Sequence, residues 1–81
     1  MKPPQIVCVE WIDAVTNPNW RTMNDVQNDK TPLSYNYEYG FVIKTKNKSS
    51  VVIGHGWNKE TGDVSSTTAI PKAWVKRVRP L

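Results

Sequence analysis

Apolar and polar residues alternate along several short stretches of the chain, and this period of two is typical of half-buried β-strands. The first stretch runs from Ile6 to Ala14 and places Val7, Val9 and Trp11 on one face. The longest runs from Ser34 to Lys46 and gathers three tyrosines, a phenylalanine and an isoleucine at one parity. Three shorter stretches rich in apolar or β-branched residues follow, at Val51–Ile53, Val64–Ile70 and Val75–Val78. Residues 54–57 form the end of the first of these three. The pattern therefore predicts five strands.

The connections between these stretches differ in length. Residues 15–33 form a long polar loop, in which the spacing of Thr22 and Asp25 predicts one helical turn over Met23–Gln27. Long loops are usually functional or fixed by their own side chains, and we expect Trp20 and Leu33 to anchor this one. The later connections are tight turns at residues 46–49 and 58–63, and a single 3₁₀ turn at residues 71–74.

This order of elements predicts an all-β fold: a small five-stranded SH3-like barrel with a long first loop and a short 3₁₀ turn before the last strand. Gly40 lies in the middle of the longest strand and indicates a bend or bulge at a barrel corner. An OB-type barrel is the alternative, but it usually has a longer insertion before its fourth strand than residues 58–63 provide. We expect residues 1–81 to form one domain.

Composition narrows the class of protein. The chain has 81 residues and a single cysteine, Cys8, so an internal disulfide is excluded. Its longest apolar runs fall far short of the roughly 20 residues that cross a bilayer, and its N-terminus lacks the apolar core of a signal peptide. We therefore expect a cytoplasmic protein that makes no membrane contact.

The formal charge of +4 is unevenly distributed. Lys44, Lys46 and Lys48 alternate, so they would share one face of a regular strand, and four further cations crowd residues 72–79. Lysine and arginine side chains hold phosphates, which makes an anion-binding surface one interpretation. The alternative is a solvated basic face that only keeps the protein soluble.

Aromatic residues stand beside polar ones at Trp20-Arg21, at residues 35–39 and at residues 55–58. Periodicity assigns Trp11 and Trp74 to the core, but a barrel this small cannot also bury every tyrosine. Exposed aromatic side chains stack on nucleobases, and neighbouring amides bind the edges of the rings. The candidate ligand-binding residues are therefore Trp20, Arg21, Tyr35, Asn36, Tyr37, Lys44, Lys46, His55, Trp57 and Arg77.

Catalytic motifs are not evident. His55 is the only histidine, and no serine or cysteine stands at a spacing typical of nucleophilic catalysis. Cys8 and His55 alone cannot supply the four ligands of a structural zinc site. The chain also lacks a glycine-rich phosphate loop. We expect a protein that is not an enzyme and that needs no metal or cofactor.

Three motifs together resemble those of a family of small uncharacterised tailed-phage proteins with an SH3-like barrel pattern. They are Val-Glu-Trp-Ile-Asp-Ala at residues 9–14, Tyr-Gly-Phe-Val-Ile at residues 39–43 and Ile-Pro-Lys-Ala-Trp-Val at residues 70–75, with Trp20 between the first two. Members of that family are often acidic, whereas this chain is basic and has a tyrosine-rich second strand. The resemblance implies a phage accessory protein in the cytoplasm of an infected host cell, and it transfers no catalytic residues.

Three functions follow from these observations. The first is a binder that counteracts host defence by sequestering an anionic, nucleotide-like signal, as a homo-oligomer with its site between protomers. The second is a nucleic-acid-binding barrel that uses its lysines and arginines on the phosphates. The third is an adaptor that binds and inhibits a host protein through its exposed aromatic residues.

Overall fold

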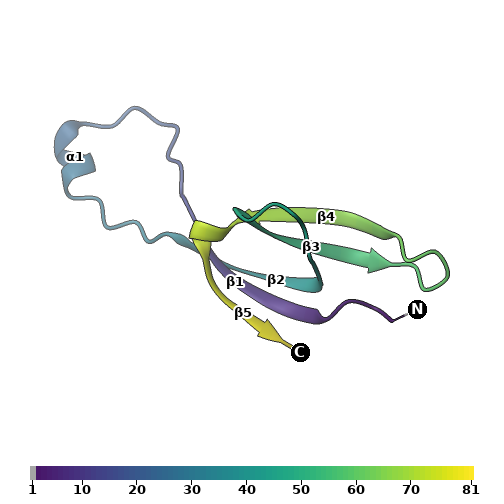
Figure 1. Ribbon diagram of the computed structural model, residues 1–81. Coiled ribbons are helices and arrows are strands. Elements are labelled where there is room, and N and C mark those ends of the chain that lie inside the picture. The colour runs from purple at the N-terminus through teal and green to yellow at the C-terminus, as the bar shows by residue number, and fades with distance from the viewer. Residues whose placement is uncertain (1) are drawn as a thin grey trace.

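The computed structural model describes residues 2–81 as one antiparallel sheet with a long arm projecting from one end (Figure 1). The strands are β1 (Ile6–Asp13), β2 (Ser34–Ile43), β3 (Ser50–Trp57), β4 (Val64–Pro71) and β5 (Val75–Pro80). A short helix, α1 (Met23–Gln27), lies between β1 and β2, and a 3₁₀ turn, η1 (Lys72–Trp74), lies between β4 and β5. The predicted all-β fold, its five strands, its helical turn and its 3₁₀ turn are confirmed.

The strands lie in the order β4-β3-β2-β1-β5, so the last strand of the chain pairs with the first. β2 pairs with β1 along residues 34–41 and with β3 along residues 41–43. Gly40 therefore lies where β2 moves from one partner to the other, as expected of a corner. Within residues 2–81 no pairing joins β4 to β5, so the sheet is folded over its core without a continuous closing ladder.

The core lies between the two halves of this folded sheet. Val7 and Val9 of β1 pack against Ile53 of β3 and Ile70 of β4, and all four are buried. Trp11, Val42, Val51 and Val75 are partly buried and pack around this cluster. Because the residues come from all five strands, burial of their apolar surface stabilises the sheet as one unit.

Trp74 departs from the prediction that it belongs to the core. Its ring stacks on Trp11 with the ring centroids 6.4 Å apart and the planes 8° from parallel, but its side chain remains 43% exposed. The η1 turn holds Trp74 at the edge of the folded sheet, where it covers Trp11 and faces solvent on its other side.

The connection between β2 and β3 begins earlier than predicted. β2 ends at Ile43, because Asn47 organises the following residues into a turn: its Oδ1 accepts hydrogen bonds from the Ser49 backbone N–H (2.9 Å) and hydroxyl (2.6 Å). Lys44, Lys46 and Lys48 consequently lie in this turn. The turn predicted at residues 46–49 is therefore present, but it begins earlier and includes Lys44, so the three lysines do not share one face of a regular strand.

Residues 14–33 form the arm, with α1 near its tip (Figure 1). The Thr22 hydroxyl caps α1 by accepting a hydrogen bond from the Asp25 backbone N–H at 3.1 Å. Neither Trp20 nor Leu33 anchors the arm as predicted, because Trp20 is fully exposed and Leu33 is 56% exposed. The arm gives the molecule its extent of 58 × 21 × 21 Å.

The corner at Gly40 yields a stability prediction. A Cβ on Gly40 would lie 2.5 Å from Ile53 Cγ2 and 2.6 Å from the Gly54 backbone oxygen. Because a backbone atom and a buried core residue cannot both move aside, we expect Gly40→Ala to lower the free energy of unfolding by about 1–3 kcal/mol. Urea unfolding followed by tryptophan fluorescence measures this change.

Gly56→Ala is the matched control, because a Cβ there meets the Ser65 hydroxyl, which can rotate away. We expect its unfolding midpoint to stay close to that of the wild type. Equal losses for both variants would show that the close packing at Gly40 is not what constrains the corner.

Candidate functional site

Three exposed tyrosines form a row along β2 on the face of the sheet opposite the core. Tyr35, Tyr37 and Tyr39 are 63%, 56% and 57% exposed. Their directly opposite residues on β1 are Ile12, Glu10 and Cys8. Side chains of directly paired residues share a face, whereas Val7 and Val9 point to the core. The tyrosines and their β1 partners therefore form the outer layer of the sheet.

β5 adds cations to the same layer, because Arg77 pairs with Glu10 and Arg79 pairs with Cys8. Glu10 Oε2 lies 3.1 Å from Arg77 Nε and 3.6 Å from Arg79 Nε. Glu10 is largely buried, at 17% side-chain exposure, while the two arginines are 56% and 50% exposed. One carboxylate oxygen thus lies within ion-pair distance of two guanidinium groups, although it accepts no hydrogen bond from either. Both guanidinium groups are at least half exposed, so their N–H donors stay accessible to a second anion.

Lys76 is the third cation on this surface, and it lies where the pairing of β1 with β5 is irregular. The β1–β5 register shifts between Glu10 and Trp11, which pair with Arg77 and Val75, so Lys76 has no direct partner. Its Nζ lies 5.8 Å from the centroid of the Tyr35 ring, within the range of a cation–π contact. A lysine and an aromatic ring therefore lie side by side at one end of the row.

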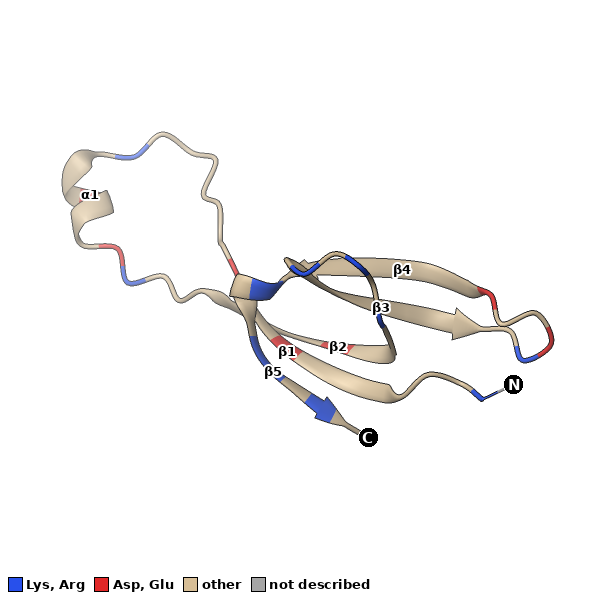
Figure 2. Ribbon diagram, viewed as in Figure 1, with Lys and Arg blue, Asp and Glu red and all other residues tan. Residues whose placement is uncertain are grey.

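We call the seven residues of this surface the tyrosine face: Glu10, Tyr35, Tyr37, Tyr39, Lys76, Arg77 and Arg79. Three cations and one carboxylate give it a formal charge of +2 (3 − 1). Figure 2 shows the basic segments of β5 beside the acidic positions on β1 and β2. An exposed surface that combines aromatic rings with net positive charge can bind anions that carry flat rings.

Cys8 lies beneath this surface and is completely buried. Its side-chain hydrogen bond with Tyr39 raises the pKa of the phenol above its usual value of 10.0. Tyr39 therefore keeps its proton throughout the physiological range and presents a neutral ring with a polar hydroxyl.

Two of the predicted site residues lie on the opposite side of the sheet. Asn36 pairs with Trp11, and its Nδ2 donates to the Ser34 carbonyl at 3.1 Å. His55 Nε2 lies 3.4 Å from Thr68 Oγ1 and 3.7 Å from Glu38 Oε2. Both neighbours approach the same ring nitrogen, whereas a base in a catalytic relay uses its two nitrogens for different partners. His55 is therefore not arranged as such a base.

The remaining predicted residues are dispersed. Trp57 packs against Phe41 with the centroids 6.4 Å apart, and Lys44 and Lys46 lie in the turn after β2. Trp20 and Arg21 are on the arm. Of the ten candidates, the structure brings only Tyr35, Tyr37 and Arg77 together on one surface.

Tyr39, Lys76 and Arg79 also belong to this surface, but the list of candidates drawn from the sequence omits them. The sequence could have indicated Tyr39, because it alternates along the strand with Tyr35 and Tyr37 and so lies on the same face. The two cations are visible in the sequence only as part of a basic C-terminus, because their position beside the tyrosines depends on the pairing of β1 with β5.

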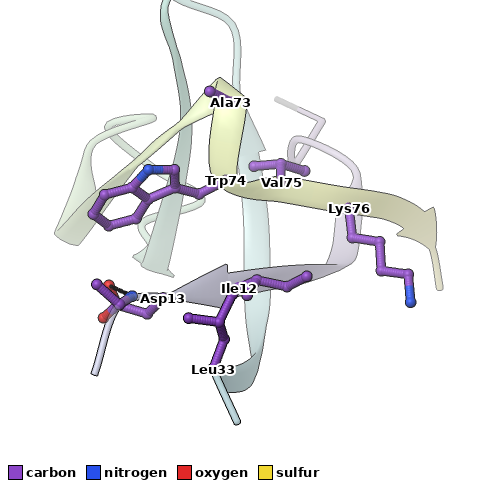
Figure 3. Close-up of a pocket in the computed structure, with 8 residues that line it drawn as sticks. Ile12, Asp13, Leu33, Ala73, Trp74, Val75 and Lys76 are labelled. Carbon is purple, nitrogen blue, oxygen red and sulfur yellow. Dashed lines mark hydrogen bonds between the residues drawn. The ribbon is translucent and has the colours of Figure 1, made fainter. Parts of the chain in front are cut away.

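A shallow apolar pocket lies where the arm leaves the sheet (Figure 3). Ile12 from β1, Leu33 from the arm and Trp74 from η1 surround the opening, and Lys76 lies at its edge. We call it the base pocket. It is separate from the row of tyrosines but adjoins it, because Ile12 pairs directly with Tyr35.

The arm carries its own polar network. Arg21 Nη1 lies 2.6 Å from Asp29 Oδ2, and Arg21 Nη2 donates to the Asp25 carbonyl at 3.2 Å. Asp29 also accepts a hydrogen bond from the Thr31 backbone N–H at 2.6 Å. These contacts join the two sides of the arm near α1, so its tip is folded although it does not pack on the sheet.

The hydrogen bonds with Thr31 and then that with Arg21 hold the pKa of Asp29 well below its ordinary value of 3.8. A carboxyl whose pKa is lower in the folded state stabilises that state above its unfolded pKa and loses this effect as the pH falls through the folded pKa. We therefore expect the arm to be ordered at neutral pH and to loosen progressively below about pH 4. Amide hydrogen exchange of Thr31 measures this change.

Asp29→Asn supplies the control for the acid transition, because its amide cannot titrate. We expect weaker Thr31 protection at neutral pH in this variant and little further change in acid. An unchanged acid transition in Asp29→Asn would assign the effect to another carboxyl.

Within residues 2–81 no group of three or more His, Cys, Asp or Glu side chains is placed to hold a metal ion. No helix in this part of the chain has the length and apolar character needed to span a membrane. Comparisons of the chain with protein-family models, with curated proteins and with solved structures find no match. The resemblance to phage proteins accordingly stays a prediction, and the function is argued below from the residues of the site.

Proposed function

We propose that this protein is a non-enzymatic binder of single-stranded nucleic acid, and that its tyrosine face is the binding surface. The observation that supports this most strongly is the row of three tyrosines, each more than half exposed, beside three cations. Alternate residues on a strand are about 6.6–6.8 Å apart, so each ring is separately accessible to one base. Stacking on aromatic rings contributes about 1–3 kcal/mol per base.

The cations of β5 lie along one side of this row and would contact the phosphates. Arg77 and Arg79 lie within ion-pair distance of Glu10 and remain at least half exposed, so their guanidinium groups are available to a ligand. Guanidinium groups bind phosphate oxygens in a bidentate manner, and Lys76 adds a point charge near Tyr35. Stacking and phosphate contacts would together hold an extended strand without requiring a particular sequence.

A second candidate is the sequestration of a nucleotide-like signal, which would fit an anti-defence role in an infected host cell. The pair formed by Lys76 and Tyr35 favours it, because one cation and one ring side by side match one phosphate and one base. A single nucleotide would use only that end of the tyrosine face. We prefer the extended ligand because it engages all three rings and both arginines.

Fluorescence anisotropy with a short oligothymidylate tests the proposal. Replacing Tyr37, the central ring, by alanine should weaken binding about 5- to 150-fold, which corresponds to the loss of one stacked base. Affinity should also rise with oligonucleotide length up to about one nucleotide per tyrosine. Binding of a mononucleotide as tight as that of the oligonucleotide would instead favour the second candidate.

The salt dependence of the same titration tests the role of the cations. Three neutralised phosphates predict a slope of log K against log salt concentration of about −2, and Arg77→Ala should make it shallower by about 0.7. Lys46→Ala removes the same charge from the turn after β2 and is the matched control. Equal losses for both variants would mean that net charge alone drives binding, which contradicts a site on the tyrosine face.

A further inference from the structure

Three lysines line one shallow pocket beside the turn that follows β2. Lys44 and Lys48 come from the turn, and Lys72 is the first residue of η1. The two segments are joined by the Lys72 backbone N–H, which donates to the Ser49 carbonyl at 2.8 Å. Figure 2 shows the basic positions of the turn beside the basic start of η1. We call this site the lysine pocket, and it shares no residue with the tyrosine face.

No carboxylate side chain balances these three charges. The chain has no Asp or Glu from residue 39 to residue 59, nor from residue 64 to residue 81. These two segments supply every residue that lines the pocket. Within residues 2–81 none of the ion pairs includes Lys44, Lys48 or Lys72. Three like charges therefore share one pocket, and a bound anion would relieve their repulsion.

Asn47 holds the turn that carries two of these lysines in shape. Its backbone N–H donates to Thr45 Oγ1 at 3.2 Å, and its Nδ2 donates to Ser50 Oγ at 3.4 Å. Its Oδ1 accepts the hydrogen bonds of the Ser49 backbone N–H and hydroxyl. Because the backbone of the turn is ordered in this way, ligand binding loses less conformational entropy than it would at a flexible loop.

The charge and the size of the pocket indicate a compact anion with several negative charges. A phosphate monoester carries about −1.5 to −2 near pH 7, whereas a phosphate within a nucleic-acid strand carries a single negative charge. A diphosphate has two linked phosphates and comes closer to the three positive charges of the lysines. The pocket volume of about 280 Å³ is below the roughly 300–1,000 Å³ of sites for drug-sized ligands. No aromatic side chain lines it, so nothing in it would stack on a base.

We infer that the lysine pocket is a second ligand site of this protein and that it binds a compact polyphosphate anion such as pyrophosphate. Each ammonium group supplies three donors, and lysine acts as a point charge on phosphates. Val51 and Val52 also line the pocket, and an apolar wall screens the attraction between opposite charges less than water does. The site adds to the proposed nucleic-acid binding and does not depend on it.

Isothermal titration calorimetry of the full chain with pyrophosphate tests the inference. Lys44→Gln, Lys48→Gln and Lys72→Gln should each weaken binding about 3- to 10-fold, an effect between that of an exposed ion pair and that of a charge-assisted hydrogen bond. All three lysines are exposed, so these variants should fold normally.

Lys46→Gln is the matched control, because it removes the same charge from the same turn but Lys46 does not line the pocket. We expect it to bind pyrophosphate nearly as tightly as the wild type. Dimethyl phosphate, which carries one negative charge, should bind much more weakly. An equal loss in Lys46→Gln, or a wild type that gives neither heat nor a rise in melting temperature with pyrophosphate, would overturn the inference.

A second pair of variants separates the built pocket from net charge. Asn47→Ala keeps every charge but removes the bonds that order the turn, so it should also weaken pyrophosphate binding several-fold. Asn58→Ala is its control, because Asn58 Oδ1 orders the distant turn after β3 by accepting from the Glu60 and Thr61 backbone N–H groups. Unchanged binding in Asn47→Ala would contradict a pre-organised site. Tyr37→Ala should leave pyrophosphate binding intact, which keeps this test separate from that of the tyrosine face.

Discussion

The pairing of β1 with both β2 and β5 is the constraint on which the rest of the molecule depends. It buries Val7, Cys8 and Val9 and separates a core face from the tyrosine face. Because side chains alternate across a strand, a slip of one residue between β1 and β2 would turn the tyrosines into the core and expose the valines. Burial of the valines on one face of the sheet therefore determines that the tyrosines lie on the other face.

The tyrosine face and the arm differ in charge and in position. The tyrosine face lies on the sheet and carries a formal charge of +2, whereas the arm is neutral and projects away from it. The base pocket lies next to Tyr35, because Ile12 of the pocket pairs with Tyr35 and Lys76 belongs to both the pocket and the tyrosine face.

Much of the fold could be predicted from local patterns. Alternation located the strands, Thr22 and Asp25 located α1, and the step Ile-Pro-Lys-Ala-Trp-Val located η1. The prediction failed in two cases. In one, a side chain forms a turn with residues near it in the sequence; in the other, the tertiary structure determines whether a side chain is buried. Hydrogen bonds of Asn47 end β2 early and remove the lysines from the strand, and Trp74 lies at an edge that periodicity cannot distinguish from the core.

The sequence by itself determined that this protein has more aromatic residues than its core can hold, and that three of them share one side of a strand. Only the tertiary structure decided which charged side chains lie beside these tyrosines. Arg77 and Arg79 join Tyr37 and Tyr39 because the last strand pairs with the first, a contact between residues about seventy positions apart. Such long-range pairing depends on the burial of the whole sheet, and no local pattern of residues encodes it.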